Sequence, residues 1–263
     1  MRGLAIVAVM FASVCIVWAR GDSEADKSQA EARAVVGKAI KAMGLEGVKL
    51  PKGIRMKSKA TIEYPVFDKD IEFATVKVDQ TITIRLPNQF KEVYEMSTLG
   101  ETAGGLTIFD GKQGWLTHNG KVSDMEEKGC DDYRELANVI EATHLITPLL
   151  DKKYKLALLD EANVDGRLAT GIRAFREGFA DLDLYFDKET YMLLKMERQG
   201  LDPVVAAQCQ ETRIYKGHRK INGRMVPASM ELLRDGRQIF NFQIVDYTFL
   251  NDVDPREFDR PKQ

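Results

Sequence analysis

The residue types that perform acid–base or metal chemistry are few and scattered in this sequence of 263 residues. The three histidines, His118, His144 and His218, have no short metal-ligand spacing between them. Because metal sites need several ligands, we expect each histidine to be a surface or structural residue. Asp181 and Asp183 would share one face of a strand, as paired catalytic carboxylates do, but we interpret them as solvent-facing partners of the apolar residues that alternate with them.

Motifs of common enzyme classes are also missing from the sequence. The chain has no Gly-x-Ser-x-Gly nucleophile motif, no His-Glu-x-x-His zinc motif and no phosphate-binding glycine loop, and Gly104-Gly105 is better explained as a turn. The sequence therefore predicts a protein that is not an enzyme and uses no metal or cofactor. A catalytic site assembled from distant residues would leave no such local pattern, so that alternative stays open.

The first residues have the pattern of a secretory signal peptide. After a basic start the chain is uncharged and mostly apolar from Gly3 to Trp18, and Ala19 stands where a signal peptidase would cut. This pattern predicts a signal peptide at 1–19 and one exported domain at 20–263, either periplasmic or secreted. The apolar run is short for a membrane span, although a retained N-terminal anchor remains an alternative.

The cysteines agree with export but leave their redox state open. Cys15 would leave with the signal peptide, and bulky Val14 before it argues against lipid attachment at that position. Cys130 and Cys209 could form one disulfide in an oxidising compartment, or both could be buried as free thiols.

The net charge limits the classes of binding partner, and the length limits the number of domains. Lys and Arg number 38 against 40 Asp and Glu, for a net charge of −2. This near-balance argues against nucleic-acid binding and against broad adhesion to an anionic membrane. A chain of this length can bury one sizeable core, and no linker rich in Pro, Ser or Gly divides it, so we expect a single monomeric domain.

Five dipeptides of the Asn-Gly or Asp-Gly type punctuate the chain. Such pairs tolerate the positive φ angles of a type I′ turn and are the strongest short signal for a β-hairpin. Repeated along alternating segments, they predict a meander of antiparallel strands. The pairs are Asp110-Gly111, Asn119-Gly120, Asp165-Gly166, Asn222-Gly223 and Asp235-Gly236.

Two segments replace this strand pattern with helical spacing. The first begins at Ser28, which forms a capping-box pattern with Glu31, and ends near Gly44, after a polar segment 20–27 that we expect to be irregular. The second is an amphipathic insert at 131–147, ended by Pro148. Its apolar stripe consists of Tyr133, Leu136, Ala137 and Ile140.

Elsewhere apolar side chains alternate with polar ones, as in strands buried on one face. One-sided alternation leaves a sheet face to be covered, and a sheet of eight or more strands tends to curl. We therefore predict a mainly β (α+β) fold, in which a curved antiparallel sheet forms an incomplete β-barrel with helices covering its concave face. The insert at 131–147 would act as a lid.

A half-open barrel need not be filled by its own side chains, and such cavities hold apolar ligands. For any single apolar residue the alternative is an ordinary core position. The candidate ligand-binding residues are Ile82, Ile84, Leu86, Phe90, Trp115, Leu136, Ile140, Leu184, Phe186, Leu194, Met196, Phe240 and Phe242.

Several short motifs follow one another along the chain: Leu86-Pro87-Asn88-Gln89-Phe90, the hairpin from Ile108 to Trp115, the strand pair Leu184-Tyr185-Phe186-Asp187 to Leu193-Leu194, Asn222-Gly223 with Pro227, and the tail from Tyr247 to Phe258-Asp259-Arg260-Pro261. They resemble motifs of the periplasmic lipoprotein-carrier superfamily, the LolA-like proteins that sort outer-membrane lipoproteins. The likeness spans most of the chain after the leader and implies an incomplete β-barrel, a helical lid and an apolar cavity for acyl chains. One departure is Leu86, since the carriers commonly place Arg immediately before the Pro-Asn pair.

Together these features predict an exported, non-catalytic carrier or chaperone that binds a lipid or an acyl chain, such as that of a lipoprotein, by burial. Each buried CH₂ group is worth about 0.8 kcal/mol, so one acyl chain could supply useful affinity. The alternatives are a periplasmic sensor or protein-interaction module with a filled core, which would bind an envelope protein, and an enzyme with a dispersed site.

Overall fold

The computed structural model describes residues 6–68, 71–98, 100–118, 120–202 and 207–262, without the side chains of 6–23, 63–68 and 71–74. Thirteen strands form one sheet in the order β6-β5-β4-β3-β2-β1-β15-β14-β11-β10-β9-β8-β7, and all neighbours are antiparallel. The first strands are β1 (Gly53–Asp68), β2 (Ile71–Arg85), β3 (Gln89–Thr98), β4 (Glu101–Phe109), β5 (Gly114–His118) and β6 (Lys121–Asp124). The others are β7 (Lys155–Val164), β8 (Arg167–Phe175), β9 (Leu182–Asp187), β10 (Leu193–Asp202), β11 (Ala207–Lys216), β14 (Ser229–Arg234) and β15 (Arg237–Leu250), while β12 (Arg219–Ile221) and β13 (Arg224–Val226) form a separate hairpin.

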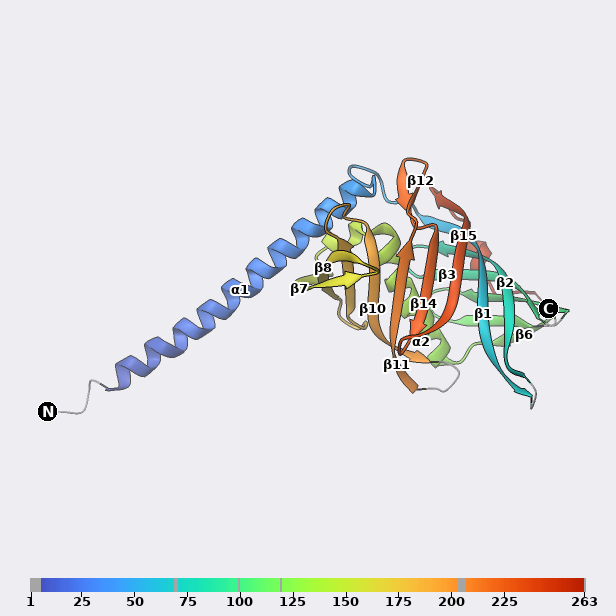
Figure 1. The fold of residues 1–263 in the computed structure, drawn as a ribbon, viewed down its shortest axis with the longest axis horizontal. Coiled ribbons are helices and arrows are strands. Elements are labelled where there is room, and N and C mark those ends of the chain that lie inside the picture. The colour runs from blue at the N-terminus through green and yellow to red at the C-terminus, as the bar shows by residue number, and fades with distance from the viewer. Residues whose placement is uncertain (1–5, 69–70, 99, 119, 203–206, 263) are drawn as a thin grey trace.

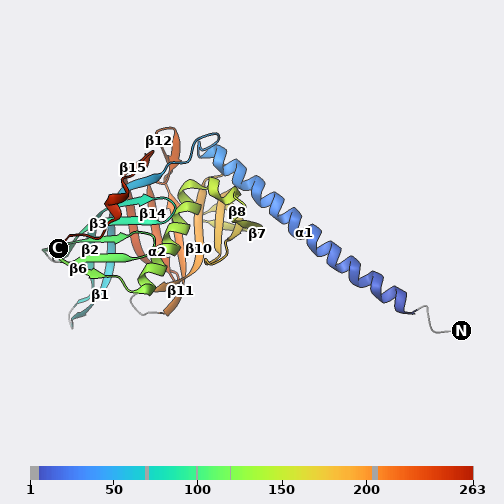
Figure 2. The same cartoon turned by 180° about the vertical axis from the view of Figure 1, so that it is seen from behind.

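The large sheet is strongly curved but does not close into a barrel, because its order ends at β6 on one side and β7 on the other (Figure 1). The chain between these two edge strands is helical. It comprises α2 (Glu127–Ile140), a π-helical turn η1 (Glu141–Leu145) and a 3₁₀ turn η2 (Thr147–Leu150). Seen from behind, α2 lies across the inner face of the sheet (Figure 2). The predicted incomplete barrel with a helix over its concave face is confirmed.

The insert itself differs from the prediction at both ends. Helix α2 begins at Glu127 rather than at Asp131, because Glu126 already has the extended conformation of an N-cap. Pro148 does not end the helical segment, since it stands in the first turn of η2, where a missing N–H costs nothing. The change of direction comes instead at Ile146, whose φ of 58° breaks the regular helix.

The N-terminal helix α1 (Ile6–Ala42) is longer than predicted. The segment 20–27 is helical, and Ser28 does not cap a helix, because its hydroxyl accepts a hydrogen bond from the backbone N–H of Leu158 at 2.9 Å. This contact and one from Arg33 to the carbonyl of Leu150 (2.8 Å) join α1 to edge strand β7 and to η2. Within the described side chains, no helix is both long and apolar enough to cross a membrane.

The predicted turns are largely confirmed. Three of the dipeptides have positive φ at both positions, as a type I′ turn requires: 165–166, 222–223 and 235–236. At Asp110-Gly111 only the glycine has positive φ, and the Asp110 carboxylate accepts hydrogen bonds from the N–H groups of Lys112 and Gln113, so this turn is held by a side chain. Asn119 lies outside the described residues.

Both remaining cysteines are free thiols. Cys130 lies near the start of α2 and Cys209 lies on β11, and both are buried. The structure therefore resolves the open alternative in favour of unpaired cysteines that pack in the interior.

Candidate functional site

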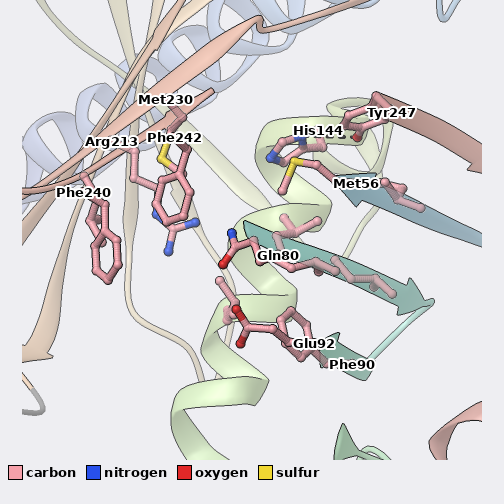
Figure 3. A pocket seen from close by; sticks show the side chains of 16 residues that line it. Met56, Gln80, Phe90, Glu92, His144, Arg213, Met230, Phe240, Phe242 and Tyr247 are labelled. Carbon is pink, nitrogen blue, oxygen red and sulfur yellow. Dashed lines mark hydrogen bonds between the residues drawn. The ribbon is translucent and has the colours of Figure 1, made fainter. Parts of the chain in front are cut away.

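An apolar cavity of about 200 Å³ lies between the curved sheet and α2. Its walls come from β1, β2 and β3 on one side and from β11, β14 and β15 on the other, and α2 with η1 closes it (Figure 3). Figure 3 shows Arg213, Met230, Phe240 and Phe242 facing Phe90 and Glu92 across the space. The lining residues are Ile54, Met56, Gln80, Ile82, Ile84, Phe90, Glu92, Leu136, Ile140, His144, Arg213, Met230, Leu232, Phe240, Phe242 and Tyr247.

The structure brings about half of the predicted ligand-binding residues together in this cavity. They come from β2, β3, α2 and β15, elements that are far apart in the sequence. They are Ile82, Ile84, Phe90, Leu136, Ile140, Phe240 and Phe242. We call strands β1–β3, β14 and β15 with α2 the cavity region.

The other predicted residues lie elsewhere. Leu184, Phe186 and Met196 are fully buried in a continuous core with the C-terminal half of α1, and do not line the cavity. We call this part, strands β7–β10 with residues 32–43 of α1, the filled region. Trp115 packs in a small cluster with Ile108, Val253 and Phe258, and Leu86 packs at the margin of the cluster around Phe90.

Leu194 is separated from Met196 by a β-bulge. The pairing of β10 with β9 shifts between Leu193 and Lys195, so that Leu193 and Met196 face the partners Phe186 and Leu184. Leu194 packs instead with Val164, Ala169 and Tyr185. A bulge adds one residue and moves the side chain to the other face, which simple alternation cannot reveal.

His144 is a site residue that no pattern in the sequence singled out. It extends from η1 into the cavity wall, where its Nδ1 lies 3.2 Å from the Tyr247 hydroxyl and its ring stacks on Tyr247 with centroids 5.8 Å apart. Burial, with a smaller contribution from the nearby Arg213 cation, lowers the pKa of His144 to about 4. The imidazole is therefore neutral at physiological pH, which suits an apolar wall.

Glu92 is the second polar group that the sequence did not single out. It follows Phe90 by two residues on β3 and faces the cavity from the same side. Burial raises the pKa of its carboxyl to about 7. Near neutral pH this wall is thus only partly charged. Gln80, also in the lining, is satisfied by donating a hydrogen bond to the Ser58 hydroxyl at 3.0 Å.

A second, larger and more polar cavity of about 600 Å³ adjoins the first. The two share Leu136, Arg213 and Leu232 in their walls, so they are neighbours, the first mostly apolar and the second more polar. Three arginines line the polar cavity, Arg198, Arg213 and Arg234, and we call them the arginine cluster.

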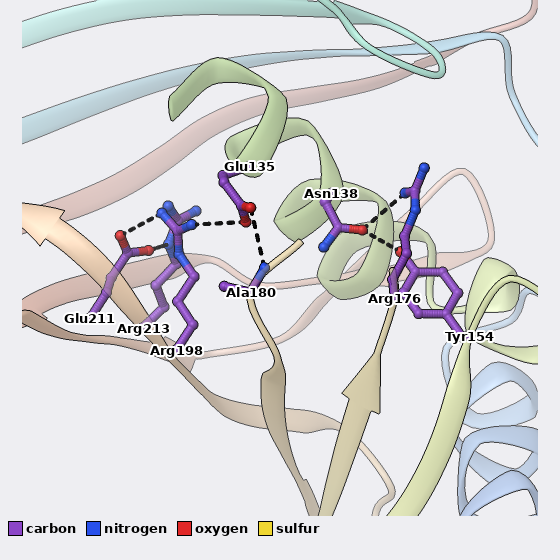
Figure 4. A network of polar contacts seen from close by, with 8 residues as sticks. All are labelled: Glu135, Asn138, Tyr154, Arg176, Ala180, Arg198, Glu211 and Arg213. Atoms are coloured by element: carbon purple, nitrogen blue, oxygen red, sulfur yellow. Dashed lines mark hydrogen bonds and ion pairs between the residues drawn. The ribbon is translucent and has the colours of Figure 1, made fainter. Parts of the chain in front are cut away.

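Two polar side chains of α2, Glu135 and Asn138, contact the sheet side of the molecule (Figure 4). Near its middle, Glu135 accepts a hydrogen bond from the N–H of Ala180 at 3.2 Å and pairs with Arg198 at 3.4 Å. One turn later, the Asn138 side-chain oxygen accepts from the Tyr154 hydroxyl at 2.7 Å and from Arg176 at 3.0 Å. Because Asn138 is buried, the second of these contacts lies in the interior of the protein.

The described residues contain no group of three or more His, Cys, Asp or Glu side chains placed to hold a metal ion. Asp183 forms a two-point ion pair with Arg173 at 2.7 Å, so it is a structural partner rather than half of a carboxylate pair. What the site offers a ligand is hydrocarbon surface next to a charged rim.

Comparison with known proteins places the fold. No protein-family model matches the chain, and no curated protein matches it in sequence. The crystal structure of an outer membrane lipoprotein-sorting protein domain from Vibrio parahaemolyticus is similar, with a TM-score of 0.51 and 12% identity over 89% of this chain and 97% of that one. A LolA superfamily protein from Nitrosomonas europaea also matches, with a TM-score of 0.47 and 10% identity over 87% of this chain and 97% of that one.

The Vibrio parahaemolyticus structure shows that this chain has the fold of a lipoprotein-sorting domain. The resemblance that the sequence motifs predicted is confirmed at that level.

Proposed function

We propose that this protein binds the acyl chain of a lipid or lipoprotein in the apolar cavity and acts as a non-catalytic carrier or chaperone. The observation that carries the proposal is the apolar cavity of about 200 Å³. It lies inside a fold that this chain shares with a lipoprotein-sorting domain. An engineered apolar cavity of about 150 Å³ stays dry and binds benzene. The space is thus large enough for part of an acyl chain.

Affinity would come from burial. At about 0.8 kcal/mol for each CH₂ group, six buried methylenes contribute on the order of 5 kcal/mol before the costs of binding. Met56 and Met230 in the lining are flexible side chains that can adapt to chains of different shape. A longer chain needs α2 to move outward, which agrees with its proposed role as a lid.

The proposal places the protein outside the cytoplasm, with cleavage after Ala19 and the domain 20–263 in the periplasm or secreted. N-terminal sequencing of the exported protein should begin at Arg20. Recovery of Met1 at the N-terminus would contradict the cleavage and support the retained anchor.

Native mass spectrometry of the protein purified from its own host tests the function. We expect a co-purifying lipid or acylated peptide that is released on denaturation. Protein that is empty, and that also fails to bind any added acyl probe, would contradict the proposal. An empty protein bound to an envelope protein would instead support the sensor module.

A further inference from the structure

The polar cavity contains more guanidinium donors than its neighbouring carboxylates engage. Glu211 is shared, because it pairs with Arg198 at 2.9 Å and with Arg213 at 2.8 Å. Although burial alone would raise it, these two cations lower the pKa of Glu211 to about 2, so it is fully ionised. One carboxylate therefore serves two buried arginines.

The remaining contacts of the arginine cluster are long or incomplete. Arg198 is only 10% exposed, its Nε has no hydrogen-bond acceptor among the described residues, and its second carboxylate, Glu135, is 3.4 Å away. The Nε of Arg234 likewise has no acceptor among the described residues, while its Nη1 lies 3.6 Å from the Asp202 carboxylate. Burying a guanidinium with unused donors is costly, so an added anionic acceptor would be stabilised here.

Arg213 connects the arginine cluster, with its unused N–H donors, to the apolar cavity. Arg213 lines both cavities: its Nε donates a hydrogen bond to Glu211 at 2.8 Å, and its side chain faces the apolar cavity (Figure 3). Asp132 and Glu135 line the polar cavity from α2 and would repel an anionic group. Such a group would therefore lie against the arginines on the sheet rather than against the helix. A ligand whose acyl chain fills the apolar cavity would bring its headgroup to Arg213.

We propose that the arginine cluster binds the anionic headgroup, a carboxylate or a phosphate, of an amphiphile whose acyl chain occupies the apolar cavity. This inference rests on the proposed function and specifies its ligand class. Guanidinium groups match both anions through paired N–H···O bonds, and they do so best where water is excluded.

Four probes with the same hydrocarbon chain separate headgroup from tail: myristate, myristyl alcohol, lyso-myristoyl phosphatidylglycerol and lyso-myristoyl phosphatidylcholine. Binding to the full chain is measured by calorimetric titration below the micelle concentration of each probe. We expect each anionic probe to bind at least about tenfold more tightly than its uncharged or zwitterionic match. Preference in the first pair only would identify a carboxylate, and in the second pair only a phosphate.

The test variant is the double substitution Arg198→Met with Glu135→Gln, which removes one charge of each sign and leaves the Glu211–Arg213 pair in place. It should lose most of the headgroup preference while still binding myristyl alcohol. The matched control, Arg173→Gln with Asp183→Asn, removes an exposed ion pair outside both cavities and should keep the preference. Arg234→Gln leaves the other two arginines paired and should reduce the preference by a smaller factor, so the test does not depend on one variant folding.

Equal binding of all four probes, or a preference that survives both cluster variants, would overturn the headgroup site and leave the acyl-chain proposal standing. Failure of all four probes to bind the parent protein would contradict both.

Discussion

The filled region and the cavity region both turn rows of apolar side chains toward the helices, but they are covered differently. In the filled region, α1 lays Ala32, Val36 and Ala39 directly on the sheet, and Leu184 and Phe186 have no exposed surface. In the cavity region, α2 spans the sheet, and about 200 Å³ stays empty beneath it. Ala32 and Ala39 are small and allow α1 to approach the sheet closely, whereas α2 presents the larger Leu136 and Ile140 to the cavity.

This difference separates stability from function. We infer that the filled region supplies most of the folding energy, because close packing maximises buried apolar surface and dispersion contacts. The cavity region contributes less folding energy because its side chains are not fully packed, and the unfilled space can accept a ligand.

The largest expected contrast is between two leucines cut to alanine. Leu184→Ala, in the filled region, should lower the free energy of unfolding by about 3–4 kcal/mol, because it opens a new void in a close-packed core. Leu232→Ala, in the cavity wall, should cost about 1–2 kcal/mol, because that side chain already borders empty space. Urea unfolding of both variants measures the difference, and equal losses would mean that the two regions are packed alike.

Enlarging a side chain should give the opposite pattern. Ile172→Phe places extra volume in a fully buried site of the filled region and should destabilise the protein by about 2 kcal/mol. Ile82→Phe projects into the cavity, so it should change stability by less than about 1 kcal/mol while weakening binding of myristate about tenfold. Urea unfolding and probe titration are the two measurements. Unchanged myristate binding by a folded Ile82→Phe variant would place the ligand elsewhere.

Glu92 makes the cavity region sensitive to pH. Its folded-state pKa of about 7 exceeds the ordinary value of 4.5, so the unfolded chain loses this proton first as the pH rises. Below pH 4.5 both states are protonated and Glu92 has no effect; stability then falls between pH 4.5 and 7, and the full loss persists above 7. Because Glu92 is partly exposed, we expect this loss to be about 2 kcal/mol.

Glu92→Gln removes this titration, so its stability relative to the parent should rise across that pH interval and then level off. Chemical unfolding at a series of pH values provides the measurement. A stability difference that does not vary with pH would show that Glu92 titrates normally.

The smallest expected effect is in the dynamics of α2. Near its middle Glu135 contacts Ala180 and Arg198, whereas Asn138 anchors the last turn beside Tyr154 and Arg176. Amide hydrogen exchange should therefore be faster in 127–135 than in 182–186 of β9 or 239–247 of β15, and added lipid should change α2 most. Equal protection in all three segments, with no response to lipid, would make α2 a fixed cover.

The sequence predicted the architecture because its signals were local. Alternation marked the strands, and Asn222-Gly223 or Asp235-Gly236 adopt the φ angles that hairpin turns require. The length of α1 was mispredicted because Ser28, a typical N-cap residue, bonds to Leu158, which lies 130 positions away. Such a partner cannot be seen from local patterns.

The candidate site was only partly predictable for the same reason. Apolar rows such as Leu184-Phe186 and Phe240-Phe242 look alike in sequence, and only the covering helix decides which row faces a cavity. The polar residues Glu92, His144 and Arg213 become site residues through burial and proximity in the folded chain. The bulge at Leu194 shifts one side chain to another cluster, and no spacing rule signals it.

The most direct test of the central claim is to locate a bound acyl chain by photo-crosslinking. A fatty acid carrying a diazirine along its chain would be bound to the full protein, irradiated, and its attachment points mapped by peptide mass spectrometry. We expect labelling of cavity residues on β2, β3, α2 and β15, such as Ile82, Phe90, Ile140 and Phe242. Labelling that falls on the filled region around Leu184 and Met196, or that spreads over the surface without saturating, would contradict it.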